Sequence, residues 1–256
     1  MRTALFLLLV AAAFAGDVRE QLPGGYIDWT GGKLVVEASG VSNTGAWKDA
    51  RAIEQSAFLQ LEPRVDELAR QVRFSGDAAV GDLLNDPGPV GESLEEGLGS
   101  WSVVETRYYE SGKVELRAEL PLQAWLRPAL ISQAAGKALV DIPLSDVTGL
   151  VVDARGLSVR PSLAPRLLAP DEQVLYAVAS LTEDAAASRM PVQWTTEPSD
   201  AVAIKRAGNK PIFVRATSVL GGCDLVLDRD DAARVQALAA NSDILSSARV
   251  VVVVEP

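Results

Sequence analysis

Histidine is absent from this sequence of 256 residues, and cysteine occurs once, as Cys223. Without histidine, the chain cannot form a Ser-His-Asp triad, a Cys-His pair or a zinc site with a histidine ligand. A single cysteine forms neither an internal disulfide nor a cysteine cluster. The phosphate-binding P-loop, the G-x-G-x-x-G loop at a helix start and the G-x-S-x-G nucleophile elbow do not occur either. These absences exclude several common enzyme chemistries, and we predict no cofactor.

Positive charge is also scarce, since 24 Lys and Arg stand against 34 Asp and Glu, a net charge of −10. Such a balance disfavours nucleic acid and anionic membrane surfaces as partners. Hydrophobic residues make up 48% of the chain and charged residues 23%, as in an ordinary globular protein. The length favours two domains over one.

The strongest local signal is at the N-terminus. Arg2 precedes an apolar stretch over residues 4–13, and Ala13-Phe14-Ala15 then forms an A-x-A cleavage site before Gly16. This pattern predicts a secretory signal peptide over residues 1–15 and a periplasmic or secreted protein. The alternatives are a membrane anchor or a buried N-terminal helix, but the stretch is short for a span of about 20 residues. No cysteine follows it to accept a lipid. No other stretch is long and apolar enough to span a bilayer, so we expect no membrane span after cleavage.

The first half predicts an α+β domain over residues 16–135. Residues 33–38 form an expected strand, and apolar residues from Trp47 to Val72 then recur every three or four positions, which predicts a helix that Pro63 interrupts. Residues 101–109 and 113–120 alternate around a turn and predict a hairpin. A short amphipathic helix follows Pro121. Residues 86–99, rich in glycine and proline, are expected to form a solvated loop, which is a poor platform for Glu95 and Glu96 as catalytic carboxylates.

The second half, residues 144–256, predicts a second α+β domain after a boundary at 132–143. Strands are expected at 149–153, 174–179, 212–220, 224–227 and 249–254, the last buried on both faces because its valines are unbroken. Asp228 is the expected N-cap of a helix that ends at Asn241-Ser242. The fold class is thus two small α+β domains, each with a mostly antiparallel sheet covered by helices.

Two further features have ordinary interpretations. Cys223 is expected to be a small buried residue, with a reactive or intermolecular thiol as the alternative. Asp228, Asp230 and Asp231 have the spacing that begins a calcium loop, but Ala233 and Ala239 stand where that loop needs glycine and glutamate. We therefore predict no metal site.

Residues 148–157, TGLVVDARGL, continue into Arg160-Pro161 and Ala164-Pro165. This segment resembles exported bacterial proteins related to the small outer-membrane lipoprotein family, a group that includes flagellar assembly proteins P and T. The segments 224–234 and 248–252 fit the same group, and the first half is similar to its lipoprotein-like domain. The resemblance implies a role in the cell envelope, although the missing lipid-acceptor cysteine departs from the lipoprotein members.

The same segment supplies the candidate site: Asp153, Arg155, Gly156 and Arg160. Asp153 and Arg155 flank one residue at the end of a strand, so they project to the same side, and Gly156 permits a tight turn. One interpretation is an ion pair that stabilises the turn. The other is a contact site for a partner chain or a cell-wall ligand, to which Arg160 adds a cation.

Two functions follow. The favoured one is a non-enzymatic periplasmic assembly or scaffold protein that associates with itself or with envelope proteins, including the flagellar basal body. The alternative is an envelope ligand-binding module or a carboxylate-based hydrolase, which would need convergent, desolvated carboxylates in a cleft.

Overall fold

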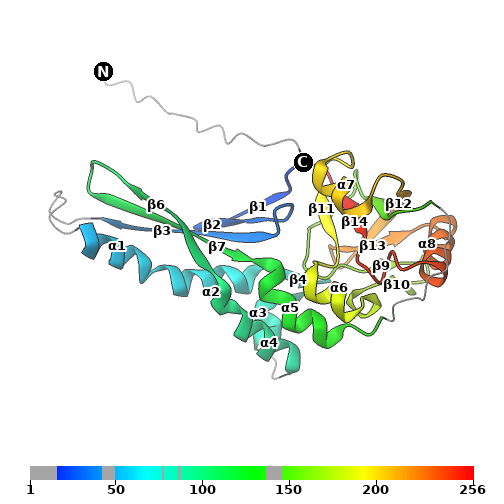
Figure 1. Cartoon of the computed structure of the whole chain (residues 1–256), viewed down its shortest axis with the longest axis horizontal. Coiled ribbons are helices and arrows are strands. Elements are labelled where there is room, and N and C mark those ends of the chain that lie inside the picture. The colour runs from blue at the N-terminus through cyan, green and yellow to red at the C-terminus, as the bar shows by residue number, and fades with distance from the viewer. Residues whose placement is uncertain (1–15, 42–49, 77, 86–87, 137–145) are drawn as a thin grey trace, which may run out of the picture.

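The computed structural model describes residues 16–41, 50–76, 78–85, 88–136 and 146–256. Figure 1 shows an elongated molecule with one sheet and its helices at each end. The two-domain α+β fold is therefore confirmed, and a family match reported below covers the second domain separately. The predicted signal peptide, Trp47 and most of the predicted boundary at 132–143 lie outside the described residues.

The first sheet is wholly antiparallel, in the order β1-β2-β3-β7-β6. Its strands are β1 (Arg19–Leu22), β2 (Gly25–Asp28), β3 (Lys33–Val41), β6 (Ser102–Tyr108) and β7 (Lys113–Pro121). The predicted hairpin is confirmed as β6 and β7, and buried residues alternate along β7 from Val114 to Leu120. The β1–β2 hairpin was not anticipated, because two four-residue strands give little alternation to read.

Helices cover one face of this sheet (Figure 1). They are α1 (Ala50–Phe58), α2 (Leu61–Gln71), α3 (Val80–Leu84), α4 (Pro89–Gly97) and α5 (Leu122–Gln133), with a 3₁₀ turn η2 (Leu98–Ser100) and a small ribbon of β4 (Arg73–Ser75) and β5 (Ala78–Ala79). The interruption predicted at Pro63 is confirmed. The break between α1 and α2 includes Leu59, whose carbonyl would meet the proline ring if the helix were continuous.

The loop expected at residues 86–99 is wrong for its described part, which is helix α4 followed by η2. Pro89 is the first residue of α4, where a missing N–H costs nothing. The glycines serve close packing: a Cβ added at Gly97 would lie 2.9 Å from the Trp125 ring of α5. Trp125 in turn donates its indole N–H to the carbonyl of the buried Leu94 at 2.9 Å.

The second sheet has the order β10-β9-β13-β12-β8-β14-β11. Its strands are β8 (Leu150–Asp153), β9 (Leu167–Leu168), β10 (Val174–Tyr176), β11 (Gln193–Thr195), β12 (Ile212–Leu220), β13 (Asp224–Leu227) and β14 (Val250–Val253). The helices are α6 (Glu183–Ser188), α7 (Ala201–Ala207) and α8 (Arg229–Asn241), with the 3₁₀ turn η3 (Val178–Ser180).

Strand direction in this sheet differs from the antiparallel pattern we expected. The pairs β9–β13, β12–β8, β8–β14 and β14–β11 are parallel, and only β10–β9 and β12–β13 are antiparallel. The predicted burial of β14 on both faces is confirmed. Val250 and Val252 join the main core, whereas Val251 and Val253 pack with Ala203 and Ala207 of α7. Burial on both faces is typical of a strand inside a parallel sheet.

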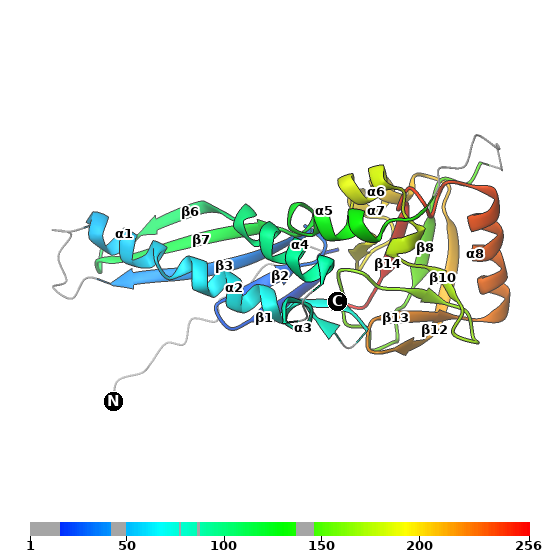
Figure 2. The same ribbon diagram turned by 90° about the horizontal axis from the view of Figure 1, so that it is seen from below.

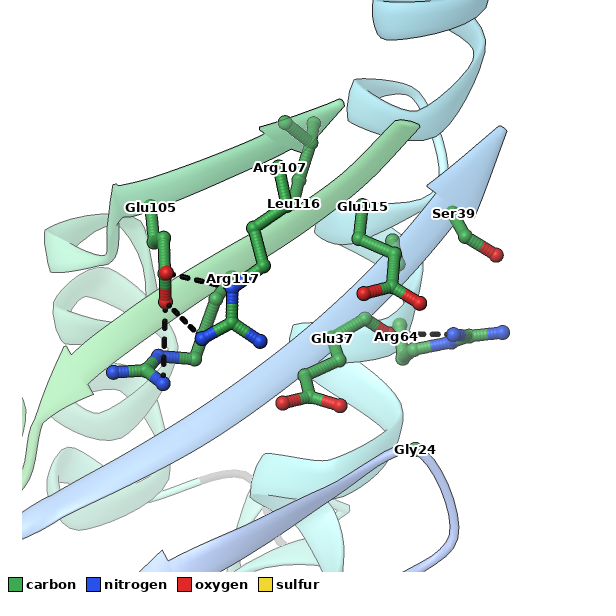
Figure 3. A pocket seen from close by; sticks show the side chains of 10 residues that line it. Gly24, Glu37, Ser39, Arg64, Glu105, Arg107, Glu115, Leu116 and Arg117 are labelled. Carbon is green, nitrogen blue, oxygen red and sulfur yellow. Dashed lines mark hydrogen bonds and ion pairs between the residues drawn. The ribbon is translucent and has the colours of Figure 1, made fainter. Parts of the chain in front are cut away.

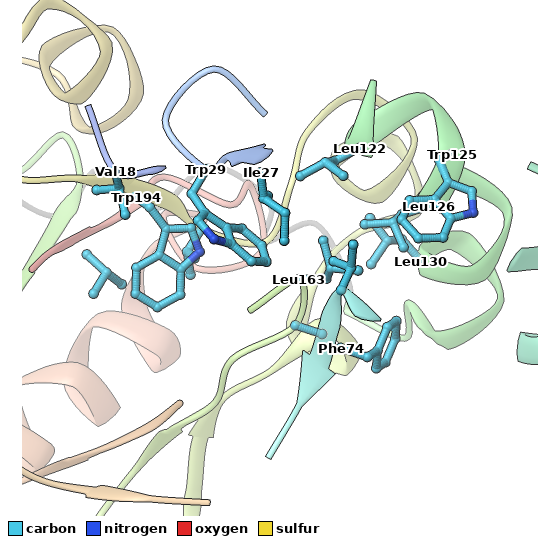
Figure 4. Packing of buried hydrophobic residues seen from close by; sticks show 14 of the residues in the cluster. Val18, Ile27, Trp29, Phe74, Leu122, Trp125, Leu126, Leu130, Leu163 and Trp194 are labelled. Carbon is cyan, nitrogen blue, oxygen red and sulfur yellow. The ribbon is translucent and has the colours of Figure 1, made fainter. Parts of the chain in front are cut away.

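The two domains share one continuous hydrophobic core. Figure 4 shows Trp29 of the first domain beside Trp194 of the second, and Leu163 close to Leu126 and Leu130 of α5. A hydrogen bond joins the same elements, because the Thr30 hydroxyl donates to the Trp194 carbonyl at 3.0 Å. We infer that the domains are packed as one unit rather than joined by a bare linker.

Candidate functional site

The predicted turn at the end of β8 contains the ion pair. Arg155 donates from Nε and Nη2 to the two carboxylate oxygens of Asp153, each at 2.8 Å, and its backbone N–H donates to Oδ1 at 3.1 Å. This bidentate contact lowers the pKa of Asp153. The Arg155 side chain is 48% exposed and that of Asp153 30%, so water screens the pair.

Gly156 follows with φ of 83°, a conformation that favours glycine. Its N–H donates to the Glu255 carboxylate at 3.1 Å, which ties the turn to the C-terminal tail. A Cβ at this position would meet nothing within 4 Å, so the requirement is conformational and not steric.

Arg160 lies in a groove between the domains. Its N–H donates to the Gly222 carbonyl at 2.9 Å, and it lines a cavity of about 520 Å³ together with Trp29, Pro161 and Glu255. Of these cavity residues, Glu255 also contacts the predicted turn, because its carboxylate accepts the hydrogen bond from the Gly156 N–H. Arg160 therefore lies in the same groove as Glu255, which contacts the turn, and it forms no ion pair with Asp153.

A second cavity, of about 220 Å³, opens on the face of the first sheet that the helices leave uncovered (Figure 3). It is lined by charged side chains of alternating sign from α2, β3, β6 and β7: Glu37, Arg64, Glu105, Arg107, Glu115 and Arg117. This charged cleft was not anticipated. Its signal was the strict alternation of charge in the segment Lys113-Val114-Glu115-Leu116-Arg117.

Two of the three carboxylates of the charged cleft, Glu105 and Glu115, are paired. Glu105 binds Arg107 at 2.6 Å and Arg117 at 3.3 Å, and the hydrogen bond from Arg107 lowers the pKa of Glu105. Lys113 and Tyr109 lower the pKa of Glu115 in the same way. A general acid at neutral pH needs a raised pKa, so Glu105 and Glu115 are unsuited to that role.

Large apolar side chains are exposed on helix α1, in the break that follows it and on the edge strand β6 of the first domain. Val104 of β6 is 48% exposed, Phe58 of α1 48% and Leu59 68%. The Phe58 ring lies 5.8 Å from that of Trp101, and Phe58 shares a cavity with Val103 of β6. We call Phe58, Leu59, Val104 and Tyr108 the exposed apolar group. Sequence reasoning missed it, because exposure of an apolar residue has no signal of its own in a helix or strand pattern.

A cationic groove of about 330 Å³ lies beside α7 in the second domain. Arg189, Lys205 and Arg206 line it together with Ser188 and Gln193, and no carboxylate is among the lining residues. Burial lowers the pKa of Arg206 to about 10, and its Nε has no hydrogen-bond partner within the described part of the chain.

Cys223 is fully buried, as expected, and burial raises the pKa of its thiol. Glu95 and Glu96 are exposed on helix α4. Over the residues that the structure describes, no group of three or more Cys, Asp or Glu residues is arranged to hold a metal ion. Within the same ranges, no helix is long and apolar enough to cross a membrane.

These features define a two-domain α+β protein with a mixed sheet in its second domain. Residues 149–256 match the family described as the second domain of Tp0624 from Treponema pallidum. The match runs from the start of β8 to the end of the chain and includes Asp153, Arg155, Gly156 and Arg160. No curated protein matches the chain.

The match relates the second domain to a bacterial family. It does not extend to the first domain, and it carries no link to outer-membrane lipoproteins or to flagellar assembly. The bacterial side of the resemblance is therefore supported, whereas its lipoprotein and flagellar side stays a prediction.

Proposed function

We propose that this chain is a non-enzymatic assembly or scaffold protein of the bacterial cell envelope, periplasmic or secreted, which acts by self-association through its first domain. The N-terminal A-x-A pattern supports export. The observation that carries the proposal is the exposed apolar group on α1 and β6, because large apolar side chains that remain exposed are typical of interaction sites.

Strand β6 adds a means of association. It lies at the edge of the first sheet, where no described strand pairs with its outer side. Antiparallel pairing of two copies about Thr106 would place Glu105 of one opposite Arg107 of the other, and Val104 opposite Tyr108. Opposite charges and an aromatic beside a β-branched residue are favourable cross-strand pairs, and a two-fold interface is the commonest kind.

The register between β6 and β7 shifts between Val103 and Glu105, which is a bulge. A bulge twists an edge strand and shortens the stretch that a partner can pair with. We therefore expect a concentration-dependent dimer and not a permanent one.

The test is size-exclusion chromatography with light scattering on the protein that begins at Gly16, over a range of concentrations. The parent should move from one to two chain masses as concentration rises, and Val104→Lys should stay at one. The matched control is Val174→Lys, which changes an edge-strand valine of the same exposure, 49%, in the second sheet. A parent that stays monomeric at all concentrations, or equal effects of both variants, would contradict self-association through β6.

The flagellar basal body is the envelope assembly that the sequence resemblance suggests as partner. Co-purification from the native envelope tests this finer proposal. Recovery of basal-body proteins with the wild type, and their loss with Val104→Lys, would support it. Recovery of the chain alone would leave self-association as its function.

The cationic groove favours a second candidate, an envelope module that binds an anionic ligand. Arg206 is half-buried, its Nη2 donates to the Met190 carbonyl, and its Nε has no hydrogen-bond partner among the described residues. Inorganic phosphate is the simplest probe, and it should raise the melting temperature of the wild type but not that of Lys205→Gln combined with Arg189→Gln. No shift in the wild type would reject this candidate.

A further inference from the structure

The first described residue, Gly16, is held inside the molecule. It is buried, and its φ of 111° lies in the region that favours glycine. Its carbonyl accepts a hydrogen bond from the Thr196 N–H at 3.1 Å, and the hydroxyl oxygens of Thr195 and Thr30 lie 3.2 and 3.3 Å from it. Figure 1 shows this end of the chain beside α7 and β11 of the second domain.

Asp200 lies against Gly16. A Cβ added at Gly16 would overlap the Asp200 carboxylate, with the carboxyl carbon only 2.6 Å away. Because a backbone nitrogen lies about 2.5 Å from the Cβ position of its own residue, the Gly16 nitrogen is within about 5 Å of that carbon and nearer still to Oδ2. Any side chain at position 16 would occupy the place of the carboxylate.

The Asp200 side chain is available for this contact. Asp200 is the N-cap residue of α7 by position, yet its side chain makes no hydrogen bond to the helix N–H groups. Its one protein contact within hydrogen-bond distance is the Thr195 hydroxyl, at 3.3 Å, among the contacts of the described residues. That hydroxyl has a single proton, for which the carbonyls of Gly16 and Glu197 compete.

The predicted cleavage site lies at this same residue. Hydrolysis of the Ala15–Gly16 bond consumes one water, leaves a carboxylate on Ala15 and turns the Gly16 amide nitrogen into an ammonium. We propose that in the processed protein the Gly16 ammonium forms an ion pair with Asp200 and so ties the N-terminus of the first domain to the second. This inference rests on the proposed removal of residues 1–15.

The pair has a structural consequence because it joins the domains at the edge of their shared core. Gly16 leads into β1 of the first sheet, whereas Asp200 begins α7, which packs on β11 and β14. An amide nitrogen at Gly16, as in the unprocessed chain, carries no charge to pair with the carboxylate. Processing therefore adds a contact between the domains that the precursor lacks.

The test compares two forms of the otherwise complete protein, one beginning at Gly16 and one that retains Ala15. The Gly16 form should melt higher by about 2–4 °C, the shift expected for a modest gain in a chain of this size. The difference should disappear in Asp200→Asn and persist in Glu197→Gln, a matched change in the same loop. Equal melting of the two forms, or a difference that survives in Asp200→Asn, would overturn the pair.

Chemical acylation of the N-terminal amine gives a second readout that global stability does not control. An ion-paired ammonium is deprotonated less often, so acylation of the Gly16 form should be about tenfold slower than in Asp200→Asn. Equal rates would refute the pair. Mass spectrometry of the protein from its native host tests processing separately: an intact segment 1–15 would overturn the export proposal and the role of the pair there, whatever the melting data show.

Discussion

Removal of side-chain volume from the inward face of β7 tests the packing of the first domain. Leu116 is 2% exposed and Leu120 is fully buried, and both join the core with Ile53, Leu61 and Leu68 of the covering helices. Leu→Ala at buried positions costs about 2–5 kcal/mol, more where the surroundings cannot collapse into the space.

The two sites differ in how far they can relax. Leu116 lines the cavity beside Phe58, so water or a neighbouring side chain can fill part of the space left by the mutation. Leu120 does not line that cavity. We therefore expect Leu116→Ala to cost about 2–3 kcal/mol and Leu120→Ala about 3–5 kcal/mol.

Urea unfolding followed by tryptophan fluorescence measures both losses as a shift of the midpoint at unchanged slope. The control on the same strand is Glu119→Ala, which removes a partly buried ion pair with Lys33 but no core side chain and should cost about 1 kcal/mol. Losses below about 0.5 kcal/mol for both leucines would refute the assignment of this face to the core. A larger loss at Leu116 than at Leu120 would refute the argument from the cavity.

Three further outcomes follow. Asp153→Ala and Arg155→Ala should each cost about 0–1 kcal/mol, since the pair is half-exposed. The double mutant should cost less than the sum of the two, because the two side chains contact each other. Because the pair lowers the pKa of Asp153, its contribution is present above about pH 4 and is lost as pH falls through the lowered value, so the wild type and Asp153→Ala should converge in acid. Cys223 should resist a thiol reagent in the native protein and react in urea; rapid native reaction would contradict its burial. Gly97→Ala should cost about 1–3 kcal/mol by pushing α4 off the Trp125 ring, and a neutral effect would show that the helices are not in close contact.

Interactions between neighbours in sequence were predictable from the sequence. The β6–β7 hairpin, the break before Pro63 and the N-cap at Asp228, whose side chain accepts from the Asp231 N–H, all depend on residues a few positions apart. The Asp153–Arg155 pair belongs to the same class, because two residues that flank one position at a strand end project together. The role of that pair, in structure or in recognition, is not decided by its geometry and stays a prediction.

Interactions between distant residues were decided only by the tertiary structure. A run of five valines predicts a strand buried on both faces, but it does not say that β14 lies parallel between β8 and β11, since each pairing joins segments tens of residues apart. The helix at 89–97 contains one proline and two glycines, which are poor helix formers, and it is stabilised by burial of Leu94 and by the close approach of Gly97 to α5, neither of which is a local property. The shared core and the meeting of Gly16 with Asp200 follow from the same cause: they need the two domains to be folded together.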